Sequence, residues 1–165
     1  MKPIIWITTI FAGILPLSSM GQEDPGKEQV GEVEVSVYFA TNKDPEAAGK
    51  SVKAIDAKLG ERLRKEPQLK FEHYRLLGQD TKALYRSYEN WAEPLKPSDA
   101  VMVRFEAQAM PRKNEVTLDL ELWLSRKKTV KTDATLMGNK PLFVLGPEWR
   151  GGRLIIAIAI ANPSK

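Results

Sequence analysis

The chain has 165 residues, of which 25 are Lys or Arg, 21 are Asp or Glu, one is His and none is Cys. A chain of this length is typical of a single domain. The absence of Cys excludes disulfide bonds, thiolate metal clusters, a Cys nucleophile and lipid attachment to an N-terminal Cys. The single His excludes zinc motifs that need a His pair. An apolar fraction of 42% is sufficient for a folded core.

The first residues have the three parts of a secretory signal peptide. Lys2 gives a positive start, residues 3–17 form an uncharged apolar run, and the small residues Ser19 and Gly21 precede a polar segment. The run is shorter than the roughly 20 residues that a membrane-spanning helix needs. We therefore expect a signal peptide over residues 1–21 and a periplasmic or secreted mature protein without a membrane span. Its net charge would be +3, because cleavage removes Lys2 and no acidic residue.

The segment after the signal peptide predicts a short lead-in followed by one folded domain. Residues 22–31 are rich in Gly and charged residues, which indicates a flexible lead-in, and residues 32–162 are expected to form a single α+β domain. Apolar and polar residues alternate over 32–39, which predicts a strand with one buried face.

An amphipathic helix is predicted between Asp44 and Pro67. Asp44 suits the N-cap and Pro45 the first helical position, because the missing N–H of proline has no intrahelical partner to lose there. Apolar residues then recur at spacings of three and four until Pro67 ends the pattern, although Gly49 could delay the start. The apolar positions are Val52, Ile55, Leu59 and Leu63.

The rest of the domain is predicted to consist of strands, because the period of the apolar residues returns to two. Turn residues separate these strands at 78–80, at Pro94 and Pro97, and at 137–140. The last run is apolar on both faces, which predicts a central position beneath the helix or a second sheet. The expected strands are 69–77, 81–91, 101–107, 115–124, 130–136, 141–145 and 154–161.

Face parity constrains the hairpin between strands 115–124 and 130–136. Even-numbered residues face the core in both strands, so the numbers of cross-strand partners must sum to an even value. A three-residue loop at 126–128 satisfies this condition, whereas a two-residue loop places core residues opposite surface residues. The three-residue loop pairs Leu124 with Val130, Leu122 with Thr132 and Leu120 with Ala134, and brings Trp123 beside Lys131 and Glu121 beside Asp133.

The predicted fold is α+β, with one amphipathic helix packed on a mostly antiparallel β-meander or sandwich of about six to eight strands. The segment 145–157 places Gly151 and Gly152 just before an apolar last strand. In this the chain resembles small exported bacterial proteins of uncharacterised families, which have a signal peptide, one helix and a β-meander ending in such a Gly-Gly corner. The resemblance implies no activity.

Few residues suit catalysis. His73 lies in a predicted strand and no Gly-x-Ser-x-Gly elbow is present, which disfavours a serine hydrolase. No Gly-rich phosphate motif is present, so no nucleotide cofactor is expected, and no metal site is indicated. Asp119 and Glu121 share one strand face with Trp123, an arrangement that permits a carbohydrate-active hydrolase. The same pattern is typical of the solvated face of an amphipathic strand.

Two groups of residues are candidate binding sites. The first is Trp123 with Lys131 on the exposed face of the predicted hairpin. In the second, Trp149, Arg150 and Arg153 surround the glycine corner and combine an aromatic face with two cations, which suits an anion or a polysaccharide. The alternative for the second group is a structural turn in which both glycines adopt positive φ and the tryptophan caps the core.

Composition and motifs together favour an exported, non-enzymatic binding or structural module that engages a component of the cell envelope. The expected partner is a protein bound at an open strand edge, or an anionic glycan bound at the basic surface. Nucleic acid is not expected for an exported protein with so mild a charge. Two alternatives remain: the carbohydrate-active hydrolase, and a subunit of a secretion or surface assembly.

Overall fold

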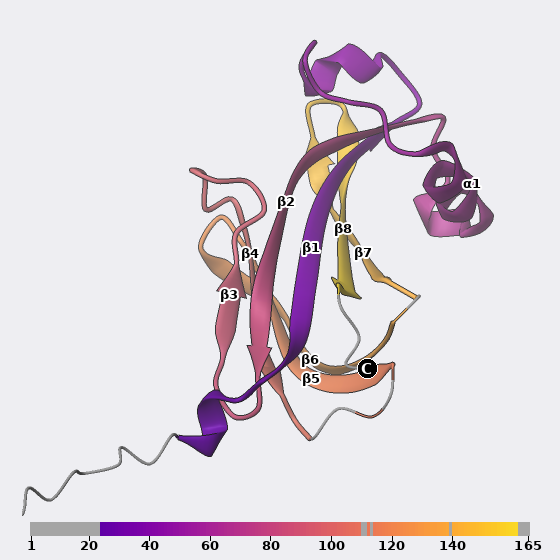
Figure 1. Ribbon diagram of the computed structural model, residues 1–165. Coiled ribbons are helices and arrows are strands. Elements are labelled where there is room, and N and C mark those ends of the chain that lie inside the picture. The colour runs from indigo at the N-terminus through magenta and orange to yellow at the C-terminus, as the bar shows by residue number, and fades with distance from the viewer. Residues whose placement is uncertain (1–23, 110–111, 113, 139, 162–165) are drawn as a thin grey trace, which may run out of the picture.

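A computed structural model describes residues 24–109, 112, 114–138 and 140–161 of the chain. The predicted signal peptide lies outside these residues. The described chain forms one domain of mostly antiparallel β-structure with one α-helix (Figure 1). Within it, no helix is long and apolar enough to cross a membrane.

In the described part of the chain, eight strands form two four-stranded sheets. Sheet A has the strand order β2-β1-β8-β7, and sheet B has the order β3-β4-β5-β6. The last strand of the chain is flanked by β1 and β7, which confirms the central position predicted from its two apolar faces. The strands are β1 (Gln29–Thr41), β2 (His73–Tyr85), β3 (Asn90–Ala92), β4 (Val101–Ala107), β5 (Glu115–Leu124), β6 (Lys127–Met137), β7 (Leu142–Trp149) and β8 (Gly152–Ile160).

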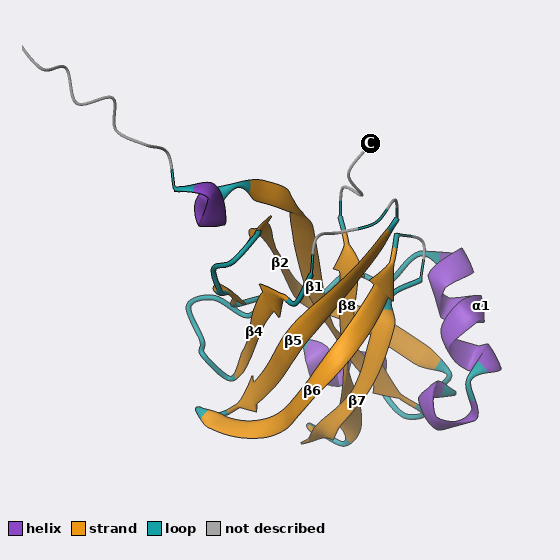
Figure 2. Cartoon of the chain, turned by 90° about the horizontal axis from the view of Figure 1, so that it is seen from below, coloured by secondary structure: helices purple, strands orange, loops and turns teal. Residues whose placement is uncertain are grey.

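The main hydrophobic core lies between the two sheets. Alternate residues of β1 and β8 meet alternate residues of β4 and β5 there; Val35, Ile156, Phe105 and Leu120 are examples, each almost completely buried. Figure 2 shows β5 and β6 crossing in front of the strands of sheet A. The fold is therefore a sandwich, one of the two forms that the strand pattern predicted.

A second, smaller apolar cluster lies on the other face of sheet A, next to α1 (Ala57–Lys65) (Figure 1). Sheet A contributes side chains such as Tyr38 and Ile155, and the 3-10 helix η3 (Pro67–Leu69) contributes Leu69. Leu63 is the fully buried apolar side chain of α1. The short helix thus adds little to the core compared with the two sheets.

The predicted helix after Asp44 is divided into two short elements, so its first half was predicted wrongly. Asp44 caps the 3-10 helix η2 (Pro45–Ala48), which ends at Gly49 with a φ angle of 121°. The chain then forms a bridge to β2 at Ala54, which holds it extended. The α-helix begins only after Asp56, whose side chain accepts hydrogen bonds from the first turn.

The turn predicted at 78–80 is absent, because β2 continues through these residues and pairs with β1 on both sides of them. A Cβ atom on Gly78 would lie 2.0 Å from the carbonyl oxygen of Pro94, in the loop after β3. Gly78 therefore marks a close approach of two backbones, which is the other common reason for a glycine within a strand.

The β5–β6 hairpin closes through a two-residue turn instead of the predicted three-residue loop. Ser125 and Arg126 have φ angles of 49° and 64°, which suit a tight hairpin turn. A register shift beyond Leu122 leaves Thr129 as an extra residue on β6 and so restores the face parity. The predicted partners are accordingly wrong: Leu122 pairs with Val130, Leu120 with Thr132, Glu121 with Lys131 and Trp123 with Lys128.

Candidate functional site

The residues that the sequence placed on one exposed strand face lie together on the outer side of sheet B. Asp119, Glu121 and Trp123 alternate along β5, and Lys131 of β6 lies opposite Glu121. The neighbouring strand β4 places Arg104 on the other side of Glu121. No helix covers this face in Figure 2, because α1 lies beside sheet A.

Arg104 is the centre of an ion-pair network on this face. Its side chain is only 14% exposed, and its guanidinium donates to Asp119 at 2.9 Å, to Glu106 at 2.8 Å and to Glu89. The hydrogen bond with Glu89 is the main cause that raises the pKa of Arg104. The guanidinium in turn lowers the pKa of Asp119, so this carboxylate is held in its charged form.

Glu121 is a carboxylate with 8% of its side chain exposed. Burial acts to raise its pKa, but hydrogen bonds to the charged form outweigh this effect and lower the pKa. The donors are Trp123 Nε1 at 3.0 Å and Lys128 Nζ at 3.3 Å, and Lys131 Nζ lies 3.4 Å away. Lys131 also lies 3.5 Å from Asp119 and thus bridges the two carboxylates.

This arrangement keeps both carboxyl groups of the pair deprotonated. Glycoside hydrolysis by two acids requires one of them to keep its proton through a raised pKa. The pKa values of both Asp119 and Glu121 are lowered, and cationic side chains already bind both groups. Trp123 packs against Trp91 with ring centroids 5.8 Å apart. The outer face of sheet B is therefore a network of mutually neutralised charges around two packed rings.

The glycine corner forms a tight turn between β7 and β8. Arg150 and Gly151 occupy the turn with φ angles of 46° and 77°. Gly152 does not have the positive φ that was predicted for it, and a Cβ there would instead lie 2.4 Å from the ring of Phe39. Only one of the two glycines therefore serves the turn conformation, and the other allows close packing.

The side chains around this corner contact the protein itself. Trp149 packs edge-on against Phe39 with ring centroids 5.5 Å apart, and the guanidinium of Arg150 lies 4.4 Å from the centroid of the Trp149 ring. Arg153 donates to a backbone carbonyl of β7 at 3.0 Å. These contacts match the structural alternative considered for this segment. The corner is not joined to Trp123 and Lys131, which belong to the other sheet.

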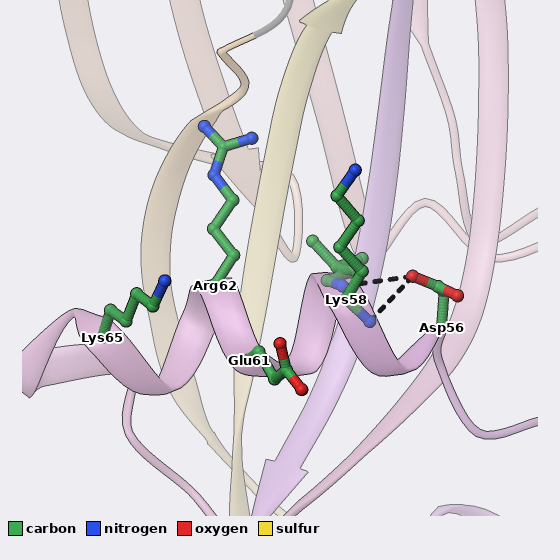
Figure 3. A pocket seen from close by; sticks show the side chains of 6 residues that line it. Asp56, Lys58, Glu61, Arg62 and Lys65 are labelled. Atoms are coloured by element: carbon green, nitrogen blue, oxygen red, sulfur yellow. Dashed lines mark hydrogen bonds between the residues drawn. The ribbon is translucent and has the colours of Figure 1, made fainter.

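A groove of about 520 Å³ follows the exposed side of α1, where the sequence reasoning placed no site. Leu63 packs against sheet A. Lys58, Arg62 and Lys65 are four and three residues apart, so they share a different side of the helix, next to the side that carries Leu63. Figure 3 shows Lys58, Arg62 and Lys65 rising from one side of α1, with Glu61 pointing away from them. The lining residues are Asp56, Lys58, Leu59, Glu61, Arg62 and Lys65.

The positive charges in this groove are only partly neutralised by the protein. The Asp56 side chain accepts hydrogen bonds from the backbone N–H groups of Lys58 and Leu59 at 2.9 and 3.2 Å, so it serves the helix terminus. The ammonium groups of Lys58 and Lys65 form no ion pair with any described residue. The guanidinium of Arg62 lies 5.6 Å from the ring centroid of Phe143 in β7.

The connection between β1 and β2 carries most of the excess positive charge of the chain. Residues 42–72 contain eight basic and six acidic side chains, whereas the rest of the expected mature sequence has 16 basic and 15 acidic side chains. A ligand approaching the α1 side therefore meets a positive surface, while the outer face of sheet B offers neutralised pairs.

Other types of site are not indicated. His73 is half-buried at the start of β2. Among the described residues, no three His, Asp or Glu side chains are arranged to hold a metal ion. Comparison with known proteins found no matching family model, no matching curated protein and no matching solved structure.

Proposed function

We propose that this chain is an exported, non-enzymatic binding module whose α1 groove engages an anionic polysaccharide of the cell envelope. The observation that supports it is the groove itself, where Lys58, Arg62 and Lys65 share one side of the helix within the segment that holds most of the excess positive charge. A helix rises by about 1.5 Å per residue, so these cations extend along a line of about 10 Å. A row of this kind suits an extended polyanion better than a single compact anion.

The other expected functions have less support. Strand addition by a protein partner is disfavoured at the edge strand β6, because Lys127, Lys128 and Lys131 lie along it; β7 is also an edge strand, and no described feature marks it for a partner. A hydrolase centred on Asp119 and Glu121 lacks a carboxyl group with a raised pKa. An anionic glycan therefore agrees best with the distribution of charge.

The direct test is binding to polygalacturonate, a polysaccharide with one carboxylate on each sugar. The purified protein should bind the immobilised polymer at low salt, and its affinity should fall as added salt screens the charges over a Debye length of about 10 Å at 0.1 M. A variant with Lys58→Ala, Arg62→Ala and Lys65→Ala should bind about tenfold or more weakly, since three neighbouring charges are lost.

The matched control removes three exposed charges elsewhere, through Arg112→Ala, Lys127→Ala and Lys140→Ala. This variant has the same net charge as the groove variant and should retain nearly wild-type affinity. Equal loss of binding in the two variants would assign the attraction to net charge alone and would refute the groove as the site. Absence of binding by the wild-type protein at low salt would also refute the proposal.

A further inference from the structure

A second cavity, of about 490 Å³, opens between the two sheets at the end of the sandwich where the β5–β6 and β7–β8 turns lie. Both sheets and the loop after β3 contribute apolar walls. The main apolar residues are Leu77, Leu95, Ala100, Leu124, Trp149 and Leu154. The volume lies within the range of about 300–1,000 Å³ that is usual for small-molecule sites.

The apolar side chains at this end are less buried than those in the rest of the core. Leu95, Leu124 and Trp149 pack against the core but are only partly buried, whereas Leu120, on the same face of β5 as Leu124, is 1% exposed. Each Å² of apolar surface removed from water stabilises by about 25 cal/mol. A hydrocarbon group that entered the cavity would therefore be favoured, because it would remove the remaining apolar surface of these side chains from water.

The rim of the cavity presents hydrogen-bond acceptors and one negative charge. Glu148 forms no ion pair with any described residue. Ser98 and Ser125 also line the cavity, and the Oγ of Ser98 accepts a hydrogen bond from the N–H of Ala100 at 3.1 Å. The rim thus suits a ligand whose polar end donates hydrogen bonds and is positively charged.

The arginines next to the rim are already engaged by other groups. Arg126, which follows Ser125, pairs with Asp99. Arg150 lies over the ring of Trp149 and donates to the carbonyl of Ala47 at 3.4 Å. Arg153, the cross-strand partner of Glu148, donates to the carbonyl of Gly146 at 3.0 Å. None of these three arginines forms an ion pair with Glu148 in the structure, so the carboxylate is left for a ligand.

From this combination we propose that the cavity binds a small amphiphile with a hydrocarbon body and a protonated amine, the amine lying beside Glu148. The hydrocarbon body lies between the sheets against Leu124 and Trp149. This site shares no residue with the α1 groove, so the two proposals are tested separately.

The test is calorimetric titration of the purified protein with decylamine, and with decanoate as the ligand of equal chain length and opposite charge. Decylamine should bind at one site, about fivefold or more tightly than decanoate, because the partly exposed carboxylate attracts one head group and repels the other. Failure of decylamine to bind, or equal affinity for the two ligands, would overturn the proposal.

Two variants locate the binding. Ala100→Phe places a bulky ring in part of the cavity and should weaken the binding of both ligands while the urea midpoint stays at or above the wild-type value. Glu148 is exposed at the rim, so Glu148→Gln should leave the stability of the fold unchanged. The variant should bind decylamine and decanoate with equal affinity, and so lose the preference for decylamine. The matched control, Glu66→Gln, removes an exposed carboxylate outside the cavity and should keep the preference. Binding unchanged by Ala100→Phe, or a preference retained in Glu148→Gln, would refute this location.

Discussion

Replacing Gly78 by alanine tests whether the backbone of β2 is locked against the loop after β3. The new Cβ would lie 2.0 Å from the Pro94 carbonyl oxygen and 3.2 Å from Cδ2 of Leu95. A separation of even 3.0 Å requires the two backbones to move apart by about 1 Å, since the first contact is with main chain and no rotamer change relieves it. Overpacking of this kind costs about 1–3 kcal/mol.

The net effect of Gly78→Ala should lie near the middle of that range. Alanine also restricts the unfolded chain, which stabilises the folded state by about 0.4–1 kcal/mol and offsets part of this cost. We therefore expect the free energy of unfolding to fall by about 2 kcal/mol. Urea unfolding followed by circular dichroism measures this as a lower midpoint with an unchanged slope. The control is Gly151→Ala, where no atom lies within 4 Å and only the φ angle of 77° is unfavourable. A wild-type midpoint for Gly78→Ala would refute the rigid contact.

Two further predictions concern charge and turn geometry. The pKa values of Asp119 and Glu121 are lowered by folding, so their stabilisation is complete above the unfolded values of about 3.9 and 4.3 and is lost as the pH falls through the lower folded values. Urea midpoints should accordingly fall between pH 5 and pH 2, and Asp119→Asn should weaken this dependence; an unchanged pH profile in the variant would contradict the assignment. Arg126→Gly should raise the free energy of unfolding by about 0.5 kcal/mol, because glycine suits the φ angle of 64° and the exposed pair that is lost is weak. A lower urea midpoint for this variant would show that the pair outweighs the turn.

The faces of the strands were predictable because a strand exposes its side chains alternately. The even-numbered residues from Val116 to Leu122 face the core as the alternation predicted, and Asp119 and Glu121 lie outside. The same alternation gave the correct parity of the β5–β6 hairpin, and the loop length was wrong because a bulge can restore parity within the strand. No sequence signal marks Thr129 as the extra residue.

The candidate site could be predicted only in part. The spacing of Lys58, Arg62 and Lys65 was readable from the sequence, but charged residues on a helix usually form a solvated face. The contact of Arg62 with the ring of Phe143, about 80 residues later in the chain, could not be predicted from the local pattern. At the glycine corner, the contact of Trp149 with Phe39 and the hydrogen bond of Arg153 to the backbone of β7 could not be predicted, and binding by these residues stays a prediction.

The sequence by itself determined the absence of thiol chemistry, the predominance of strands, the central last strand and the sign of the charge, because these depend on composition and on short-range periodicity. Only the tertiary structure decided that Gly78 is a close approach and not a turn, that the excess charge borders a groove, and that half-buried leucines meet Glu148 at a cavity. The contact at Gly78 and the cavity beside Glu148 depend on different segments of the chain, and local patterns do not specify which distant segments come into contact.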